Sequence, residues 1–231
     1  AGLDKNGDFV DVLDSLGFGF IEIGTTTPKP QKGNPKPRVF RYTSSKAVIN
    51  RLGFNNKGVD YLASKIKNKK FNAIIGVNIG ANKTSTKEKR IEDYKVCFEK
   101  IYQYADYVTV NISSPNTPEL RNLHDPNELE KIFESINSIK IKNASKIPVF
   151  LKISPDESKE SIDRIIEVVR KSKFTGIIAT NTTIDKSSLS NSKLRNIEGG
   201  LSGEPLMKKS TDILRYIKDK SNHQIPVIGV G

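Results

Sequence analysis

The chain has 231 residues, with 38 lysines and arginines against 26 aspartates and glutamates, for a net charge of +12. This length suits one domain with a sizeable core, or one large barrel cut short. No platform of aromatic and basic side chains accompanies the positive charge, so we expect no nucleic-acid partner. The single cysteine, Cys97, excludes a disulfide framework and any cysteine-based zinc or iron–sulfur site within this chain, and no signal peptide or apolar run of transmembrane length is present.

Apolar runs and helical periodicity predict strands and helices that alternate along the chain. After a polar stretch at 1–7, which we interpret as the end of a first strand, strands are predicted at 17–27, 73–80, 108–112, 148–155, 176–183 and 226–231. Helix faces are predicted from Phe9, Val12, Leu13 and Leu16, and then in the ranges 59–66, 91–102, 125–139, 162–169 and 206–217. Most consecutive strands are therefore separated by one helix.

Two segments depart from this alternation. Residues 28–41 carry four prolines with lysines between them, which indicates an excursion, and 39–41 could pair with 47–49 as a small hairpin. Residues 199–203, GGLSG, are predicted to be a glycine loop before the last helix.

The alternation of strand and helix predicts a parallel sheet, and several strands are apolar throughout, as buried parallel strands are. A doubly wound sheet and a (β/α)8 TIM barrel both fit this pattern. No GxGxxG follows the first strand, and polar groups recur at nearly every strand end, which favours the barrel. We therefore predict an α/β fold in one domain, 1–231: an incomplete barrel with about strands 2–7, the tail of strand 1 and a hairpin excursion near 28–50.

The predicted strand ends carry amides, hydroxyls and two lysines rather than clustered carboxylates or histidines. His124 and His223 lie apart, in a loop and near a helix end, so no metal site or Ser-His-Asp site is expected. Neutral donors and acceptors with scattered lysines suit a planar cofactor such as a flavin and a small anionic heterocycle. Glycine turns at 199–203 and 229–231 lie where barrels often bind a phosphate through backbone N–H groups.

Eight motifs together resemble the dihydroorotate dehydrogenases. They are AGLDKNG, FIEIGTTTP, INRLGFNN, NISSPNTP, the lysine of FLKIS, ATNTT, GGLSG and IPVIGVG, which occur in this order from residue 1 to residue 231. The sequence is most similar to the membrane-associated, quinone-dependent class, because Ser114 stands where the soluble class has cysteine. The resemblance implies FMN-dependent oxidation of dihydroorotate to orotate in pyrimidine synthesis, with a quinone as electron acceptor.

The resemblance also implies residue roles. Ser114 would be the base that takes a proton from carbon 5 of dihydroorotate while hydride leaves carbon 6 for FMN. Substrate contacts would come from Lys5, Asn50, Arg51, Leu52, Gly53, Phe54, Asn111, Asn116, Asn181 and Thr182. FMN contacts would come from Ala1, Gly2, Leu3, Asp4, Lys5, Thr25, Asn78, Asn111, Lys152, Thr180 and Gly203. Thr117 and Phe54 are the neighbours expected to shape a proton exit path.

The sequence departs from the family at Glu119, which stands where glycine is usual on the expected substrate lid. Both ends look cut, so we expect that helices for peripheral attachment to the cytoplasmic side of a bacterial inner membrane precede Ala1, and that the fragment alone neither holds FMN tightly nor catalyses. A related dihydropyrimidine or dihydrouridine reductase, and a basic module that binds nucleic acid or a membrane surface, are the alternative functions.

Overall fold

The computed structural model describes residues 2–67, 69–113, 126–189 and 192–230. Its internal contacts divide the chain into two compact units, each made of separate stretches. Unit 1 comprises Ala1–Gly33, Phe54–Asn111 and Asn127–Phe150, and unit 2 comprises Asn34–Gly53, Ile112–Pro126 and Leu151–Gly231. The assignment of 1–231 to a single barrel domain stays a prediction.

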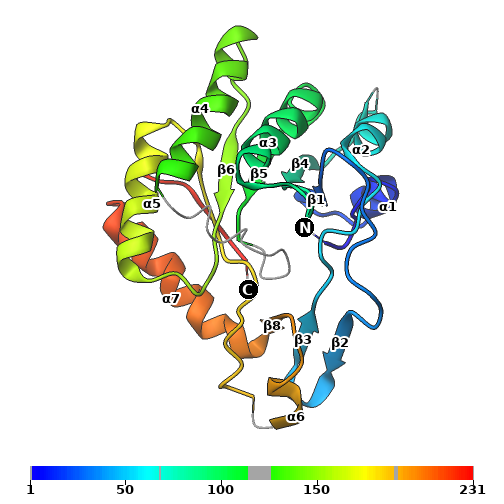
Figure 1. Cartoon of the computed structure of the whole chain (residues 1–231), viewed down its shortest axis with the longest axis vertical. Coiled ribbons are helices and arrows are strands. Elements are labelled where there is room, and N and C mark those ends of the chain that lie inside the picture. The colour runs from blue at the N-terminus through cyan, green and yellow to red at the C-terminus, as the bar shows by residue number, and fades with distance from the viewer. Residues whose placement is uncertain (1, 68, 114–125, 190–191, 231) are drawn as a thin grey trace. The chain divides into compact units, whose positions relative to one another are not determined.

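The strands form a six-stranded sheet of order β1-β4-β5-β6-β7-β9 and a three-stranded sheet of order β2-β3-β8 (Figure 1). Their bounds are β1 Phe20–Thr26, β2 Val39–Tyr42, β3 Ala47–Asn50, β4 Ile74–Ile79, β5 Tyr107–Asn111, β6 Val149–Lys152, β7 Gly176–Ala179, β8 Gly200–Gly203 and β9 Val227–Gly229. The β1–β4, β4–β5 and β7–β9 pairs are parallel. All six predicted barrel strands are present, and the predicted polar residues Thr25, Asn78, Asn111 and Lys152 lie within the last two residues of their strands.

The helices are α1 Val10–Ser15, α2 Val59–Ile66, α3 Lys87–Ile101, α4 Pro126–Lys142, α5 Lys159–Lys171, α6 Ser192–Arg195 and α7 Glu204–Lys220, with a 3-10 turn at Thr43–Ser45. The predicted buried face of α1 is wrong in part. Phe9, Val12 and Leu16 are more than half exposed, and Val10 and Leu13 are the buried residues. The short α1 ends at Ser15, so it has too few turns for the spacing of its apolar residues to settle one face. Among the described residues, no helix is both long enough and apolar enough to cross a membrane.

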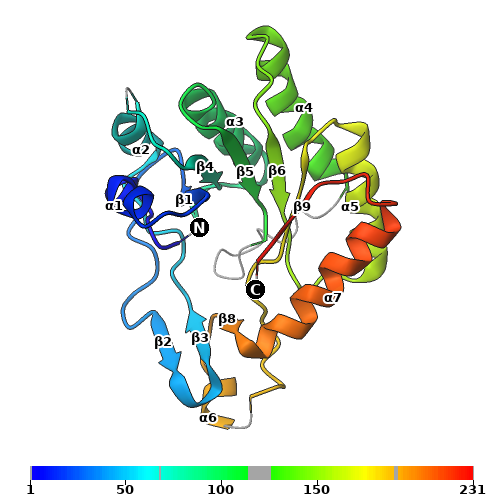
Figure 2. The same cartoon turned by 180° about the vertical axis from the view of Figure 1, so that it is seen from behind.

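The core of unit 1 is formed by strands that are buried on both faces. Val77 and Ile79 of β4 and Val108 and Val110 of β5 are fully buried, as expected for parallel strands covered by helices. Figure 2 shows α2 and α3, which supply buried residues such as Leu62 and Phe98, on the same side of unit 1. These strands place their carboxyl ends, and the polar residues there, next to one another.

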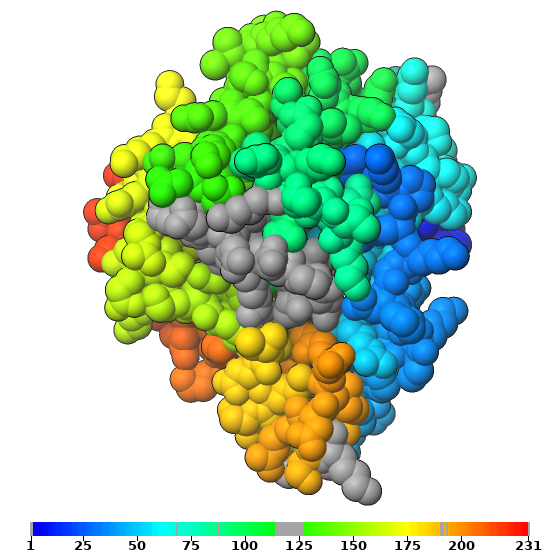
Figure 3. Space-filling view, viewed as in Figure 1, coloured from blue at the N-terminus to red at the C-terminus, as the bar shows by residue number. Residues whose placement is uncertain are grey.

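Unit 2 contains the predicted hairpin, in which β2 and β3 pair antiparallel. The predicted glycine loop at 199–203 is wrong, because Gly200–Gly203 forms β8, antiparallel to β3. Glycine is required there by close approach: a Cβ at Gly199 would lie 2.4 Å from the Asn50 carbonyl oxygen, and one at Gly203 would lie 2.2 Å from that of Lys46. Figure 3 shows the orange atoms near residue 200 beside the blue atoms of the hairpin.

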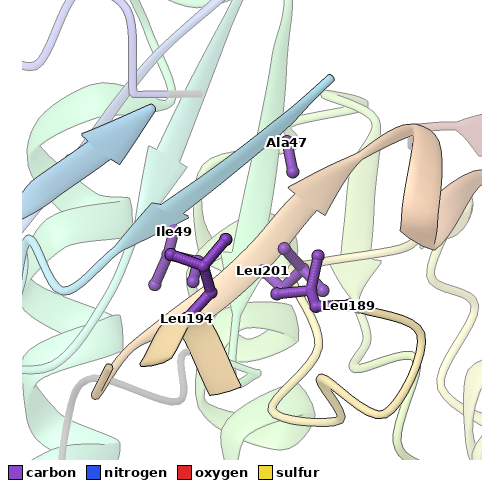
Figure 4. Close-up of a cluster of buried hydrophobic side chains, with 5 residues drawn as sticks. All are labelled: Ala47, Ile49, Leu189, Leu194 and Leu201. Atoms are coloured by element: carbon purple, nitrogen blue, oxygen red, sulfur yellow. The ribbon is translucent and has the colours of Figure 1, made fainter. Parts of the chain in front are cut away.

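A small hydrophobic cluster holds this second sheet together. It is formed by Ala47, Ile49, Leu189, Leu194 and Leu201, which Figure 4 shows gathered between β3, β8 and α6. Ile49 and Leu201 are fully buried and occupy paired positions in the two strands. The cluster fixes the position of Asn50, the last residue of β3.

Candidate active site

The N-terminal loop of unit 1 is organised by the buried carboxylate of Asp4. Its Oδ1 accepts hydrogen bonds from the backbone N–H groups of Asn6, Gly7 and Asp8, and its Oδ2 accepts one from Phe9 at 2.8 Å. The Asp4 carbonyl oxygen also accepts from the Gly24 N–H in β1 at 2.9 Å. The loop that carries Gly2, Leu3 and Lys5 is therefore attached to the carboxyl end of β1.

Three predicted flavin contacts lie together at the ends of β1, β4 and β5. The Thr25 hydroxyl donates to Asn78 Oδ1 at 2.6 Å, and Asn111 Nδ2 donates to both Thr25 Oγ1 and Asn78 Oδ1 at 3.2 Å. All three side chains are at least 95% buried. We call Thr25, Asn78 and Asn111 the amide cluster.

Glu22 of β1 lies next to the amide cluster and was not predicted as a site residue. Its Oε1 accepts from Asn78 Nδ2 at 3.0 Å, and its Oε2 accepts from the hydroxyls of Thr109 at 2.7 Å and Tyr107 at 3.4 Å. Burial, and then the Glu22 carboxylate, raises the pKa of the Tyr107 phenol well above its ordinary value, so the phenol stays protonated.

The predicted substrate loop begins in unit 2 at Asn50. The Arg51 guanidinium donates to the Pro37 carbonyl oxygen at 3.0 and 3.1 Å and lies over the Phe40 ring at 5.6 Å, so its side chain braces the hairpin. The backbone carbonyl of Leu52 accepts from the Asn34 N–H, and a Cβ at Gly53 would lie 2.9 Å from the Asn34 side chain. These contacts hold the backbone of the loop in place, and its predicted contacts with the substrate stay a prediction.

In unit 1 the same loop continues through Phe54, which is buried with a φ of +53°. Asn56 fixes it by donating from Nδ2 to the Phe54 carbonyl oxygen at 2.7 Å. Among the described residues, one buried side-chain polar atom lacks a hydrogen-bond partner, the Oδ1 of Asn55. Such an atom is costly unless a ligand or water reaches it, so Asn55 is a further candidate contact. Its place in the NRLGFNN motif is the sequence signal.

The predicted residues of unit 2 lie at the ends of β6 and β7. Lys152 closes β6 and is 6% exposed, and Thr180 follows β7 and is 2% exposed. Asn181 Nδ2 donates to the Ser113 hydroxyl at 3.0 Å, while its Oδ1 accepts from the Thr182 N–H at 2.8 Å. Asn181 is thus held beside the residue that precedes the predicted base.

Asp156 holds the loops around these residues in place. Its carboxylate accepts from Lys209 Nζ at 2.8 Å, from the Ile184 N–H at 3.0 Å and from the Thr183 hydroxyl. Burial acts to raise the pKa of Asp156, but the hydrogen bonds from Lys209 and Thr183 outweigh it, so the pKa lies below its usual value. The carboxylate therefore joins α7 to the segments that follow β6 and β7.

Several predicted residues lie outside the described residues, namely Ala1, Ser114, Asn116, Thr117, Glu119 and His124. In the part of the chain that the structure describes, no group of three or more His, Cys, Asp or Glu residues could hold a metal ion. A cavity of about 460 Å3 in unit 2, between α5, α7 and the segment after β7, is lined by residues such as Ile162, Leu206 and Tyr216 and by none of the predicted site residues.

The residues present fit a flavin. An isoalloxazine ring presents hydrogen-bond donors and acceptors along a planar edge, and buried neutral amides and hydroxyls such as the amide cluster can match both kinds. Lys152, in unit 2, is also buried, and its predicted contact with the flavin stays a prediction. Gly203 lies in β8, and its predicted role at the flavin phosphate stays a prediction.

The family model and the named relatives point to the same family. The family model for dihydroorotate dehydrogenase matches residues 1–231. Proteins named dihydroorotate dehydrogenase (quinone) from Acinetobacter baylyi and from Buchnera aphidicola are 49% and 50% identical over 235 aligned residues, covering 100% of this chain and 70% of each relative.

Solved structures show the same relation. Ligand-free DHODH from Eimeria tenella matches 100% of this chain and 71% of its own with a TM-score of 0.91 and 34% identity. The ferulenol complex of the Eimeria tenella DHODH matches 98% of this chain and 67% of its own with a TM-score of 0.89 and 33% identity. The predicted incomplete α/β barrel is confirmed, and so is the predicted family: the chain belongs to the dihydroorotate dehydrogenases.

Proposed function

We propose that this protein oxidises dihydroorotate to orotate in pyrimidine synthesis and passes the electrons to a quinone. The observation that carries the proposal is the match, over the whole chain, to relatives named dihydroorotate dehydrogenase (quinone) at 46–50% identity. The dihydroorotate dehydrogenase family implies a flavin cofactor, and we infer that the flavin is FMN. When bound, the flavin supplies the acceptor for the hydride that leaves carbon 6 of the substrate.

The chain's own residues would bind the substrate and move one proton. Ser114 would take the proton from carbon 5, and because a serine hydroxyl is a weak base it must pass its own proton onward in the same step. Asn50, Asn111, Asn116, Asn181 and Thr182 would bind the ring edges and the carboxylate. Lys5 would lie between flavin and substrate, and the buried Lys152 would stabilise negative charge on the reduced flavin.

A quinone acceptor implies work at a membrane, since quinones dissolve in the lipid bilayer. We therefore infer that the protein attaches to the membrane surface, on the cytoplasmic side in a bacterium. Sedimentation with vesicles that contain a quinone would test this attachment separately from catalysis.

An anaerobic absorbance experiment tests the reaction. The protein, expressed from its complete reading frame, should carry a flavin whose visible band bleaches with dihydroorotate and persists with dihydrouracil, which lacks the ring carboxylate. A flavin band that dihydroorotate leaves unchanged would refute the proposed substrate. A protein that binds no flavin would refute the proposed reaction.

The role of Ser114 is tested by the same measurement. We expect Ser114→Ala to slow bleaching by at least about 100-fold, the low end for loss of a general base, with flavin content unchanged. Ser113→Ala is the matched control, because Ser113 is the neighbouring hydroxyl that accepts from Asn181. A Ser114→Ala variant as fast as Ser113→Ala would exclude Ser114 as the base.

A further inference from the structure

The Glu22 carboxylate accepts hydrogen bonds from side chains of two other strands of the sheet. It lies in β1 opposite Gly76 of β4, which is in turn opposite Tyr107 of β5. Gly76 carries no side chain, so the Tyr107 phenol passes over it and reaches Glu22 across the middle strand. The carboxylate thus receives donors from two strands, Asn78 on β4 and both Thr109 and Tyr107 on β5.

A carboxylate can only accept hydrogen bonds, so it fixes the direction of the bond from Asn78. The Asn78 amide must turn its Nδ2 toward Glu22 Oε1, and its Oδ1 must then face the other way. That oxygen accepts from Thr25 and Asn111. A reversed amide would place its oxygen against the carboxylate and its NH2 group against the NH2 group of Asn111.

The orientation of Asn78 also decides which groups donate and which accept in the other hydrogen bonds of the amide cluster. Because the Thr25 hydroxyl donates to Asn78, it is an acceptor toward Asn111. Because Asn111 donates to both neighbours through Nδ2, its Oδ1 lies on the opposite side of its amide group as an acceptor. We propose that Glu22 is a positioning residue for the flavin site: its carboxylate fixes the orientation of the Asn78 amide, and through it which groups of Thr25 and Asn111 donate and which accept hydrogen bonds.

This inference rests on the proposed function, which places the amide cluster against the flavin. The test is the dissociation constant of FMN, measured by quenching of flavin fluorescence on titration into the apoprotein expressed from the complete reading frame. Glu22→Gln keeps the shape, but glutamine can donate as well as accept, so both orientations of Asn78 become possible. We expect the dissociation constant to rise about tenfold or more, since hydrogen bonds to charged groups are the strong ones.

An exchange of the two groups separates orientation from stability. In Glu22→Gln/Asn78→Asp, the introduced glutamine would donate to the introduced carboxylate, and that carboxylate would still accept from Thr25 and Asn111. Because Asn78 is itself a predicted flavin contact, the comparison is with Asn78→Asp alone, in which two carboxylates face each other. We expect the double variant to bind FMN at least about tenfold more tightly than that single variant. The matched control is Thr109→Val, which removes a 2.7 Å donor to the same carboxylate without freeing Asn78. It should lower the melting temperature of the apoprotein yet leave the dissociation constant within about threefold.

Three results would overturn the proposal: FMN binding unchanged in Glu22→Gln, equal weakening in Thr109→Val, or no recovery in the exchanged pair relative to Asn78→Asp. If Glu22→Gln yields no folded protein, the exchanged pair is compared with Asn78→Asp: tighter FMN binding by the pair supports the proposal, and equal or weaker binding refutes it. A wild type that binds no FMN would refute the proposed function together with this inference. A wild type that binds FMN, with unaltered variants, refutes this inference only.

Discussion

Gly76 offers a direct test of how the strands of unit 1 pack. A Cβ at this position would lie 2.0 Å from Cζ of Tyr107 and 2.4 Å from its Cε1 and Cε2. Ordinary contacts of this kind are 3.4 Å or longer, so Gly76→Ala forces the ring or the strand to move by more than 1 Å, about the difference between those distances. The ring has little room, because Tyr107 is 5% exposed and packs edge-to-face against Phe20 and Phe150 with centroids 6.4 and 5.6 Å away.

The expected cost follows from what the ring would lose. Two aromatic pairs are worth about 0.5–1.5 kcal/mol each, and a phenol hydrogen bond is worth about 1 kcal/mol. Overpacking alone costs about 1–3 kcal/mol. Because a displaced ring relieves part of the clash, the terms do not simply add, and we expect Gly76→Ala to lower the free energy of unfolding by about 3 to 4 kcal/mol. That corresponds to a fall in melting temperature of about 6 to 16 °C for a chain of this size.

The assay is unfolding followed by circular dichroism, with one control and one rescue. Gly19→Ala is the control, because a Cβ there has no atom within 4 Å and we expect a change within about 0.5 kcal/mol. The rescue is Tyr107→Val, which removes the ring. In the Tyr107→Val background, Gly76→Ala should cause almost no further loss in the free energy of unfolding. The coupling energy between the two substitutions should therefore be about 3 kcal/mol. If Gly76→Ala is as mild as Gly19→Ala, or if the two changes are additive, the packing argument fails.

Two further predictions concern buried and charged groups of unit 1. Tyr94→Phe removes the fully buried hydroxyl that donates to the Asn111 carbonyl oxygen at 2.8 Å, and urea unfolding should show a loss of about 1 to 3 kcal/mol; no loss would mean that water replaces the hydroxyl. The Tyr61 hydroxyl, followed by the Lys57 ammonium, lowers the pKa of Asp8 to about 2. The folded-state pKa lies below the unfolded value of about 3.9, so Asp8 stabilises the protein above that value, and the stabilisation is lost as pH falls toward 2. The stability difference between wild type and Asp8→Asn should therefore be constant from about pH 5 to 7 and shrink between about pH 4 and pH 2; a difference that does not vary over that range would contradict the pKa.

Apolar runs predicted the barrel strands well because burial on both faces leaves a local signature. Val77 and Val108 lie in such runs, and both are fully buried. The polar strand ends were also recognisable, and for Thr25, Asn78 and Asn111 the structure brings them into direct contact. Parallel strands place their carboxyl ends at one edge of the sheet. The position of each polar residue along its strand was therefore sufficient to predict that these residues lie close together.

Other features depend on partners distant in sequence and carry little local signal. A lone glutamate between Ile21 and Ile23 has the alternation of a solvent-facing residue. Asn78, Thr109 and Tyr107, which donate to it, lie on two other strands. The β8 strand has the composition of a glycine loop, because close approach of the β3 backbone excludes side chains at Gly199 and Gly203. Neither feature can be found without knowing which strands are neighbours.

The interleaved chain path of the two units bears on synthesis of the protein. The chain alternates between the units five times, so neither is complete until late. Within unit 2, β3 pairs with β8, which leaves the ribosome about 150 residues later, after roughly 8 to 30 s at ordinary translation rates. An isolated two-stranded hairpin is marginally stable. During that interval β3 has an unpaired edge and Ile49 lacks Leu201, which is when a chaperone or an unwanted β-partner would meet the nascent chain.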